Sequence, residues 1–344
     1  MKNRVGKAAL SCLVVVLGLG FLVGCATPAK EAASPPSAPS TPVPPAAAPS
    51  TPAPPAVTAP VAPAPAAQFP IKITDELGRV VTVKRAPQRI VSLAPSNMEI
   101  LFSLGLGDKI IGRTDYDDYP PAAKSIASVG GYTNPSIEKI VALSPDIIFV
   151  VALHKPKVIP VLESMGYTVI GLDPQTVDQV LDAITLVGKV TGETEEASRV
   201  TASLQTRIKA VTDKTDKLTA AQRPKTFYIV WPDPLMSAGN STFQSDLIQK
   251  AGGTNIAQGL NGWATISLEA VITANPEIMI AGTGADMASN NSQFIKTEPR
   301  LANTDARRLN KVYEVDGNKI SRPGPRLVDA LEQFAKVIHP ELFK

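Results

Sequence analysis

The sequence predicts an α/β protein of two lobes that are joined by one long helix. Short apolar runs alternate with helical patterns over residues 89–190, and the same alternation returns after residue 224. This alternation is typical of βαβ units and of a parallel sheet in each half. The stretch between the halves, residues 194–218, carries a single apolar stripe at helical spacing. A cleft between two such lobes is the first place to expect a bound ligand.

The first residues predict export and a lipid anchor. Lys2, Arg4 and Lys7 precede an apolar run, which is the charge pattern and length of a secretory signal peptide. The run ends in LVGC, with Cys25 as its last residue, and this pattern is typical of the lipobox at which bacterial lipoproteins are cleaved and lipidated. We therefore expect residues 1–24 to be a signal peptide and Cys25 to carry lipid.

Cysteine usage and charge exclude several classes of protein. Cys12 lies in the predicted signal peptide, and a lipidated Cys25 leaves no thiol for a disulfide, a metal site or catalysis. The whole chain has a net charge of +3, with 34 Lys and Arg against 31 Asp and Glu. Three of the basic residues belong to the signal peptide, so the remaining charge is balanced. We therefore expect no nucleic-acid partner.

A low-complexity segment separates the anchor from the folded part. Residues 35–68 consist almost purely of Pro, Ala, Ser and Thr. Such a segment has no apolar periodicity to bury and is expected to be disordered, with stretches of polyproline II. We interpret residues 25–68 as a tether between a lipid on Cys25 and the folded part.

The folded part begins with a β-hairpin and continues as an N-terminal lobe, residues 69–192. The hairpin strands are expected at residues 71–74 and 80–83, with Gly78 free to take the positive φ that a bulged turn needs. Buried strands are then expected at 89–93, 110–112, 147–151 and 169–172, and helices at 98–104, 137–143, 158–165 and 177–190.

A bridging helix and a C-terminal lobe follow, at residues 193–222 and 223–344. The apolar residues of the helix lie three, four or seven apart from Ala197 to Leu218. A helix of about 25 residues spans roughly 40 Å, which is enough to reach from one lobe to the other. In the C-terminal lobe, strands are expected at 226–230, 278–281 and 312–315, and helices at 243–251, 268–273 and 327–338.

One phrase occurs twice in the chain, once in each lobe. Residues 136–150 read SIEKIVALSPDIIFV, and residues 267–281 read SLEAVITANPEIMIA. Ser136 and Ser267 are good helix N-caps, and the Glu two residues later lies in the first turn, where the helix dipole favours a negative charge. From the residues alone, this structural role for the two Glu residues and a functional role stay equally open.

Several separated segments together identify a family resemblance. They are the two repeated phrases, RIVSLAPSNMEILFSLGLGDKIIGRTDYDDYPP at residues 89–121, and SRPGPRLVDALEQFAKVIHPELF at residues 321–343. With these segments the chain resembles the substrate-binding proteins of ABC importers for cobalamin, iron-siderophores and heme. It is most similar to the cobalamin-binding branch, and the resemblance runs from residue 69 to the C-terminus.

The resemblance implies a fold, a function and partners. The fold is two α/β lobes bridged by one long helix, with the ligand cleft between the lobes, as in helical-backbone metal-chelate receptors. The function is capture of cobalamin or a related corrinoid and delivery to the permease dimer and ATPase of an ABC importer. The protein would be a monomer, lipid-anchored to the outer face of the cytoplasmic membrane (cell surface or periplasm). Each lobe of such a protein presents a Glu to Arg residues of one permease subunit, and Glu138 and Glu269 match these positions.

The same resemblance points to ligand-binding residues. Aromatic residues face the ligand of cobalamin-binding relatives at the positions of Tyr116, Tyr132 and Trp263. Trp231 follows a predicted strand and is expected to line the cleft, and Arg322 is expected to donate hydrogen bonds from the second lobe. The alternative for each aromatic residue is packing in a loop or in a lobe core, and the sequence around Trp263 reads as a loop.

Two iron-containing ligands compete with cobalamin. A ferric siderophore or heme is the alternative within the same importer class, and Val150 and Val151 stand where cobalamin-binding relatives can carry an aromatic residue. Against an anionic chelate, Asp115, Asp117 and Asp118 are expected as a solvated acidic loop at the cleft rim, although Arg113, Lys155 and Arg322 are cations that such a ligand recruits. His154 is expected to be a solvated loop residue rather than an axial metal ligand.

Enzymes and non-transport lipoproteins are the other classes of protein to consider. The chain contains neither a GxSxG elbow nor a P-loop, so we expect no enzyme, no catalytic residue, no resident cofactor and no metal site. A ligand sensor or scaffold lipoprotein without transport is the alternative of another class. Arg326 is expected to start the last helix and to make a structural contact.

Overall fold

The computed structural model describes residues 68–284 and 290–343, and all of them belong to one compact unit, Val61–Lys344. The predicted signal peptide, the expected lipidation site Cys25 and nearly all of the expected tether lie outside the described residues. None of the helices in the two described ranges offers an apolar stretch of bilayer length.

A β-hairpin opens the described chain, as the sequence predicts. Strand β1 (Ile71–Thr74) pairs antiparallel with β2 (Val80–Val83). Asp75 closes the turn between them, because its Oδ1 accepts a hydrogen bond from the backbone N–H of Arg79 at 2.8 Å. Gly78 has the predicted positive φ, 78°.

The first sheet has four parallel strands in the order β4-β3-β5-β6. One of its faces is packed by α2 and α3, whose Ile140 and Leu162 share a buried cluster with Val91 and Ile148. Each strand and helix that the sequence predicts in this half is present. The bounds are β3 (Ile90–Ser92), α1 (Pro95–Ser103), β4 (Ile110–Gly112), α2 (Ile137–Ala142), β5 (Ile147–Val150), α3 (Val158–Ser164), β6 (Val169–Gly171) and α4 (Val177–Thr191).

The second sheet is mixed and has six strands, in the order β10-β8-β7-β11-β12 with β9 beside β7. Its strands β7, β11 and β12 run parallel, and β8 and β10 extend the sheet antiparallel at one side. The strands are β7 (Lys225–Pro232), β8 (Leu235–Ala238), β9 (Thr254–Asn255), β10 (Trp263–Thr265), β11 (Ile278–Thr283) and β12 (Val312–Asp316). The helices are α6 (Phe243–Lys250), α7 (Leu268–Ala274), α8 (Asn291–Thr297), α9 (Asp305–Arg308), α10 (Gly317–Ile320) and α11 (Leu327–Ile338).

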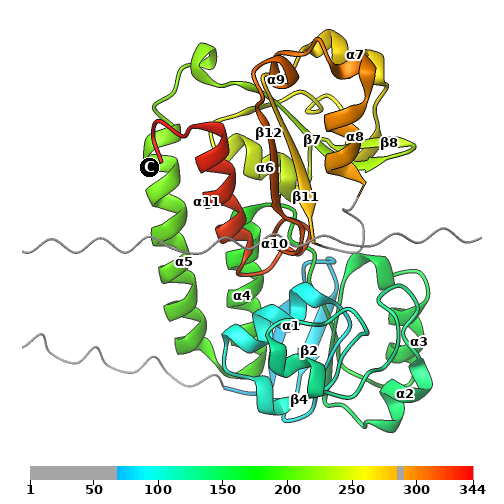
Figure 1. Cartoon of the computed structure of the whole chain (residues 1–344). Coiled ribbons are helices and arrows are strands. Elements are labelled where there is room, and N and C mark those ends of the chain that lie inside the picture. The colour runs from blue at the N-terminus through cyan, green and yellow to red at the C-terminus, as the bar shows by residue number, and fades with distance from the viewer. Residues whose placement is uncertain (1–67, 285–289, 344) are drawn as a thin grey trace, which may run out of the picture. The chain divides into compact units, whose positions relative to one another are not determined.

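Helix α5 (Thr194–Thr215) joins the two halves, as predicted (Figure 1). Its 22 residues make it about 33 Å long. It packs against α4 from the first half and α11 from the second, and Arg207 pairs with Asp329 and Glu332 of α11 at 2.7 and 2.8 Å. The helix ends before Leu218, which the sequence assigns to it.

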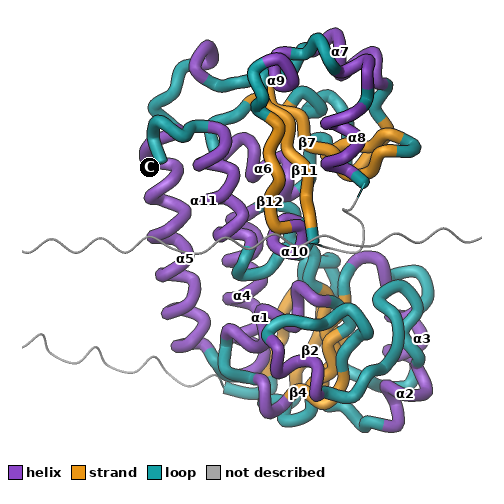
Figure 2. Tube along the Cα trace, in the orientation of Figure 1, coloured by secondary structure: helices purple, strands orange, loops and turns teal. Residues whose placement is uncertain are grey.

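The hydrophobic core continues from one sheet to the other. A single buried cluster holds Met98 and Ile184 from the first half together with Phe334 from the second. Helix α4 also contacts the second half directly, because the backbone N–H of Val177 donates to Asp246 at 2.7 Å. Helix α4 lies beside the bridging helix α5, as Figure 2 shows, and adds to the contact between the halves.

Six elements of the second half are absent from the sequence prediction. They are β8, β9, β10, α8, α9 and α10, and none exceeds seven residues. Such segments are too short to show a periodic apolar pattern. Trp263 is the first residue of β10, so the expectation that it lies in a loop is wrong.

Candidate functional site

Three of the predicted aromatic residues are exposed rather than packed in a core. Tyr116 is 51% exposed in the loop that follows β4, and Trp231 is 39% exposed near the carboxyl end of β7. Trp263 is 42% exposed on β10. In α/β folds ligands bind beyond the carboxyl ends of the parallel strands, and exposed apolar groups there mark a binding surface.

Sheet register places Trp231 and Trp263 on the same face of the second sheet. Trp263 pairs with Ala238, which lies on the same face of β8 as Met236, two residues away. Met236 pairs in turn with Trp231 of β7. The register shifts between residues 229 and 231, so a β-bulge turns Trp231 onto this face instead of the opposite one. Trp231, Met236 and Trp263 thus form one surface, here called the aromatic shelf.

Both indole rings of the aromatic shelf are fixed by hydrogen bonds. Trp231 Nε1 donates to the carbonyl of Asp233 at 2.8 Å. Trp263 Nε1 donates to Oε1 of Gln244 at 3.1 Å, and the ring of Phe243 meets the indole edge-on with centroids 5.6 Å apart. A tryptophan that is open to solvent on one side and anchored on the other is suited to stack against a ligand.

The bulge beside Trp231 is held by a buried side chain of α8. Asn291 Nδ2 donates to the carbonyl of Val230, the extra residue of the bulge, at 2.9 Å. Asn291 is only 3% exposed, and within the described residues its Oδ1 has no hydrogen-bond partner. Packing from a distant helix therefore decides which way Trp231 points.

Tyr132 is half-buried, and its ring contacts the ring of His154. The two rings meet edge-on, with centroids 5.9 Å apart. His154 Nδ1 accepts a hydrogen bond from the backbone N–H of Val151 at 3.2 Å, so the ring proton lies on Nε2, which donates to the carbonyl of Tyr132 at 2.8 Å. Burial raises the pKa of Tyr132, and nearby carboxylates add to this shift.

The expectation that His154 is a solvated loop residue is wrong. Its side chain is buried, with the whole residue 1% exposed, and its ring packs against the ring of Tyr132. Burial lowers the pKa of His154, which favours the neutral ring. Since both ring nitrogens are engaged with backbone groups, His154 has no free nitrogen to ligate a metal.

The expectation of a solvated acidic loop after β4 is wrong for Asp117, whereas Asp115 and Asp118 are exposed as predicted. Asp117 is 1% exposed and accepts hydrogen bonds from the backbone N–H and Oγ1 of Thr114, both at 2.9 Å. Burial raises the pKa of Asp117 to about 7. Asp118 pairs with Arg322, and Asp115 accepts a hydrogen bond from Ser128. Of the three, only Asp118 forms an ion pair among the described residues, and Asp115 stays exposed.

The segment 321–326 connects the second half to the first through two arginines. Arg322 Nη1 lies 2.5 Å from Oδ1 of Asp118. Burial disfavours the charged form of Asp118, but the hydrogen bond and charge of Arg322 outweigh it and lower its pKa. Arg322 therefore lies beside the loop that follows β4, with its charge already paired.

Arg326 makes the structural contact that the sequence predicts. Its Nε and Nη2 donate to the two carboxylate oxygens of Glu99 on α1, at 3.0 and 2.5 Å. The guanidinium also stacks on the ring of Tyr119, 3.7 Å from its centroid. Glu99 is 4% exposed, and burial raises its pKa despite the pairing with Arg326. A buried, bidentate pair of this kind is costly to break, so it restrains movement between the halves.

The two repeated Glu residues lie on the surface. Glu138 is exposed in the first turn of α2, and Glu269 is in the first turn of α7 with its side chain 74% exposed. Among the described residues neither carboxylate accepts a hydrogen bond, and Glu269 has only Arg300, at 4.0 Å. Both side chains are therefore free to contact another molecule.

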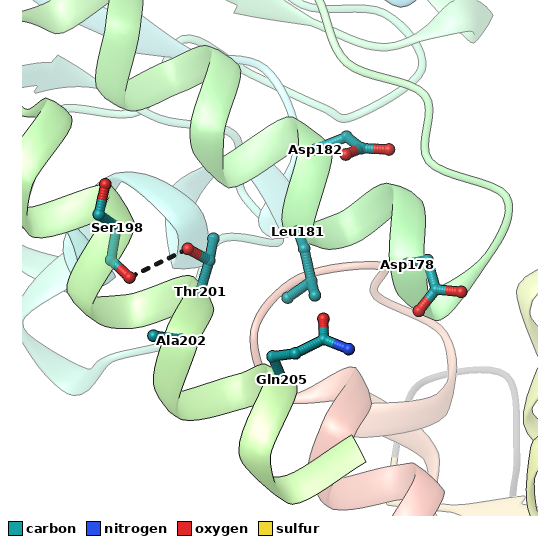
Figure 3. A pocket seen from close by; sticks show the side chains of 7 residues that line it. All are labelled: Asp178, Leu181, Asp182, Ser198, Thr201, Ala202 and Gln205. Carbon is teal, nitrogen blue, oxygen red and sulfur yellow. Dashed lines mark hydrogen bonds between the residues drawn. The ribbon is translucent and has the colours of Figure 1, made fainter. Parts of the chain in front are cut away.

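Two hollows of the described surface are lined by none of these residues. One is a groove between α4 and α5, lined by Asp178, Leu181, Asp182, Ser198, Thr201, Ala202 and Gln205 (Figure 3). The other lies beside β12 and α11 and is lined by Glu314, Gln333 and Lys336 among others. Over residues 68–284 and 290–343, no group of three or more His, Cys, Asp or Glu side chains is arranged to hold a metal ion.

Comparison with known proteins decides the family. Residues 90–318 match the Periplasmic binding protein family. The chain belongs to this family. An uncharacterized ABC transporter substrate-binding lipoprotein of Bacillus subtilis is 30% identical over 284 residues, which cover 80% of this chain and 88% of the relative. The chain is therefore a substrate-binding protein of the ABC importer class, which works with a permease and an ATPase.

Other members of the family that are similar to the chain are named for cobalamin. A cobalamin-binding protein of Halobacterium salinarum is 28% identical, with 79% of this chain and 74% of the relative covered. The solved structure of the periplasmic vitamin B12 binding protein of Vibrio cholerae matches with a TM-score of 0.65 and 25% identity, and 75% of this chain and 99% of that chain are covered. A possible iron-binding (periplasmic solute-binding) protein from Staphylococcus epidermidis matches with a TM-score of 0.65 and 28% identity, over 74% of this chain and 100% of that chain. These matches confirm the two-lobe fold and leave the ligand open.

Sequence reasoning misses part of the candidate site. Met236 belongs to the aromatic shelf, and Tyr119 (41%) and Leu153 (47%) are exposed in the loop after β4 and just after β5. A signal for Met236 was present, because Asp-Pro after a strand predicts a hairpin and hence a return strand. The buried partners Gln244 and His154 carry no local signal, since only the tertiary fold brings them to Trp263 and Tyr132.

Proposed function

We propose that the protein captures cobalamin or a related corrinoid and delivers it to the permease of an ABC importer. The aromatic shelf is the observation that carries this proposal. A corrinoid is a large, flat and amphipathic ring with amide arms, and such a ligand needs aromatic faces with a few hydrogen-bond donors. Trp231 and Trp263 supply two exposed faces on one surface, and the cobalamin-binding relatives support the same ligand.

The arginines near the cleft favour this ligand over a ferric siderophore. An anionic chelate needs cations with free donors. Arg113 instead donates to the backbone carbonyls of Thr114, Lys124 and Ile126, and Arg322 pairs with Asp118. The expected argument from an acidic rim is weaker and rests on the exposed Asp115, because Asp117 is buried and Asp118 is paired. The engaged arginines support a ligand without strong negative charge.

Titration of the purified protein with cyanocobalamin tests the ligand. We expect one-to-one binding at a Kd of about 1 μM or tighter by calorimetry. Trp263→Ala should weaken it by about tenfold or more, because buried aromatic anchors dominate binding. Leu309→Ala is the matched control, since Leu309 is a large apolar residue, 58% exposed, outside the shelf. If the protein binds heme or a ferric siderophore but does not bind cyanocobalamin, the proposed ligand is wrong.

The proposal includes docking through Glu138 and Glu269 and a lipid anchor on Cys25. One exposed Glu in each half suits a partner made of two equivalent permease subunits, and charge pairs of this kind set register and rate of encounter. The lipoprotein relative of Bacillus subtilis supports the anchor, which would hold the protein at the outer face of the cytoplasmic membrane. Cys25→Ser should release the protein from the membrane fraction, and retention of this variant would contradict the anchor.

A further inference from the structure

We propose that Gln244 is a positioning residue that sets the orientation of Trp263 and couples it to the segment joining the two halves. The inference deepens the proposed function, since it rests on Trp263 being a ligand-binding residue. Gln244 lies in the first turn of α6 and is 4% exposed. It is therefore itself hidden from a ligand and can act only through its neighbours.

Both ends of the Gln244 amide are used. Its Oε1 accepts from Trp263 Nε1 at 3.1 Å, and its Nε2 donates to the carbonyl of Ile320 at 3.2 Å. If the amide were turned over, its NH₂ would face the indole N–H and its oxygen would face a carbonyl oxygen. Only one orientation satisfies both partners, so the indole is held at a defined angle on the shelf.

The hydrogen bond from Gln244 to the carbonyl of Ile320 gives Gln244 a second role, which is to connect Trp263 to the segment after α10. Ile320 ends α10, and Arg322 and Arg326 follow within six residues. These arginines pair with Asp118 and Glu99 of the first half. Gln244 thus links the indole ring to the segment that fixes the spacing of the halves, and a shift of that segment would act on the ring through one amide.

The other half contains a similar arrangement. Tyr132 occupies the position equivalent to Trp263, six residues before the repeated Glu. There the ring of the buried His154 packs edge-on against Tyr132, as Phe243 does at Trp263, and its Nε2 donates to the backbone carbonyl of Tyr132 rather than to the side chain. Two site residues that are each anchored by a buried polar side chain indicate preorganised binding, in which the rings are set before the ligand arrives.

Fluorescence of the ligand-free protein tests the inference without any ligand. The chain has two tryptophans, so Trp231→Phe leaves Trp263 as the sole emitter. In this background we expect Gln244→Met to lower the steady-state anisotropy of Trp263 and shift its emission to the red. Gln249→Met is the control on the same helix, because this exposed glutamine of α6 donates to Ser245 and does not contact the indole. Equal spectra for the Gln244 and Gln249 variants would overturn the proposal.

Binding of cyanocobalamin adds a second readout. Gln244→Met should weaken binding about 3- to 10-fold, the range expected for one hydrogen bond. The effect should vanish when Trp263 is already replaced by Phe, which keeps a ring but has no N–H. An undiminished effect of Gln244→Met in the Trp263→Phe background would contradict positioning through the indole. Wild-type protein that fails to bind cyanocobalamin would refute the proposed ligand, while the fluorescence result would still decide the role of Gln244.

Discussion

The α2–β5 unit of the first half and the α7–β11 unit of the second use the same local contacts, although they pack against different cores. Oγ of Ser136 and of Ser267 accepts a hydrogen bond from the backbone N–H three residues later, at 3.2 and 3.0 Å. Ser144 and Asn275, which end these helices, both adopt the left-handed conformation, with φ of 46° and 47°. The repeat in the sequence is therefore a repeat in backbone geometry.

The acidic residue that follows the proline also has the same task in both units. Asp146 accepts a hydrogen bond from the backbone N–H of Arg89 at 3.1 Å, and Glu277 accepts one from Lys225 at 3.1 Å. Each acid thus ties its unit to the residue that precedes or begins the first strand of its sheet. These contacts explain the acid as a structural residue.

The two units differ at their surfaces. Glu138 has no cation within ion-pair distance among the described residues, whereas Glu269 lies 4.0 Å from Arg300, which pairs with Glu298 at 2.8 Å. Every other polar residue of the shared phrase named above has a structural partner. The comparison sets the Glu apart within one short pattern, because among the described residues its carboxylate accepts no hydrogen bond in either unit.

The largest effect is expected from reversing both surface charges. Glu138→Arg combined with Glu269→Arg should lower ligand uptake and stimulation of the importer ATPase at least about tenfold, because like charges would face the permease. Ligand affinity should not change. Glu195→Arg combined with Asp216→Arg, at the two ends of α5, is the control with the same change in net charge. Normal uptake by the Glu138 and Glu269 variant would favour the sensor or scaffold alternative.

A core substitution tests whether the two units are equally important for stability. Ile140 of α2 and Val271 of α7 are both 0% exposed. Ile140→Ala should lower the free energy of unfolding by about 2–5 kcal/mol, and Val271→Ala by less because fewer methyl groups are lost. Urea unfolding measures both. Ile272→Ala, at a 36% exposed position, should stay within about 0.5 kcal/mol. A loss at Ile140 no greater than at Ile272 would refute the core assignment.

The two N-cap serines should contribute equally to the free energy of unfolding if the repeat is structural. Ser136→Ala and Ser267→Ala should each lower the free energy of unfolding by about 1 kcal/mol, since each leaves one helix N–H without its acceptor. The double variant should show the sum of the two effects, because the sites belong to separate clusters. A difference of more than about 1 kcal/mol between the two single variants would break the equivalence of the units.

The smallest effect concerns the pH dependence contributed by Asp146. Burial opposes its charged form, but hydrogen bonds from Arg85 and from the backbone of Gln88 and Arg89 outweigh burial and lower its pKa below the ordinary value of 3.8. Because the folded-state pKa is the lower one, this stabilisation is fully present above about pH 4 and is lost as the pH falls through the folded-state pKa. Asp146→Asn should therefore flatten the decline of Tm below pH 4. If Tm of the Asp146→Asn variant falls with pH below 4 as steeply as that of the wild type, this carboxylate does not contribute to the pH dependence of stability.

The sequence by itself determines the order of the long elements and the repeated units. Apolar periodicity places the parallel strands and helices within a few residues, because a buried face must repeat at the period of its element. The N-caps and the hairpin follow from single residues with strong local preferences, and the bridging helix follows from its apolar stripe. The family resemblance adds Tyr116, Tyr132 and Trp263, and the exposed positions of Tyr116 and Trp263 agree with a surface role.

Only the tertiary structure decides how these side chains are held. The bulge at Val230 and the contact from Asn291 choose the face of Trp231, and burial converts Asp117 and His154 from expected surface groups into structural ones. Such outcomes depend on partners that are distant in the chain, since hydrogen-bond satisfaction and desolvation act through space. A pattern of neighbouring residues carries no record of them, and for this reason the segments that form the shelf and its supports are those that the sequence describes least well.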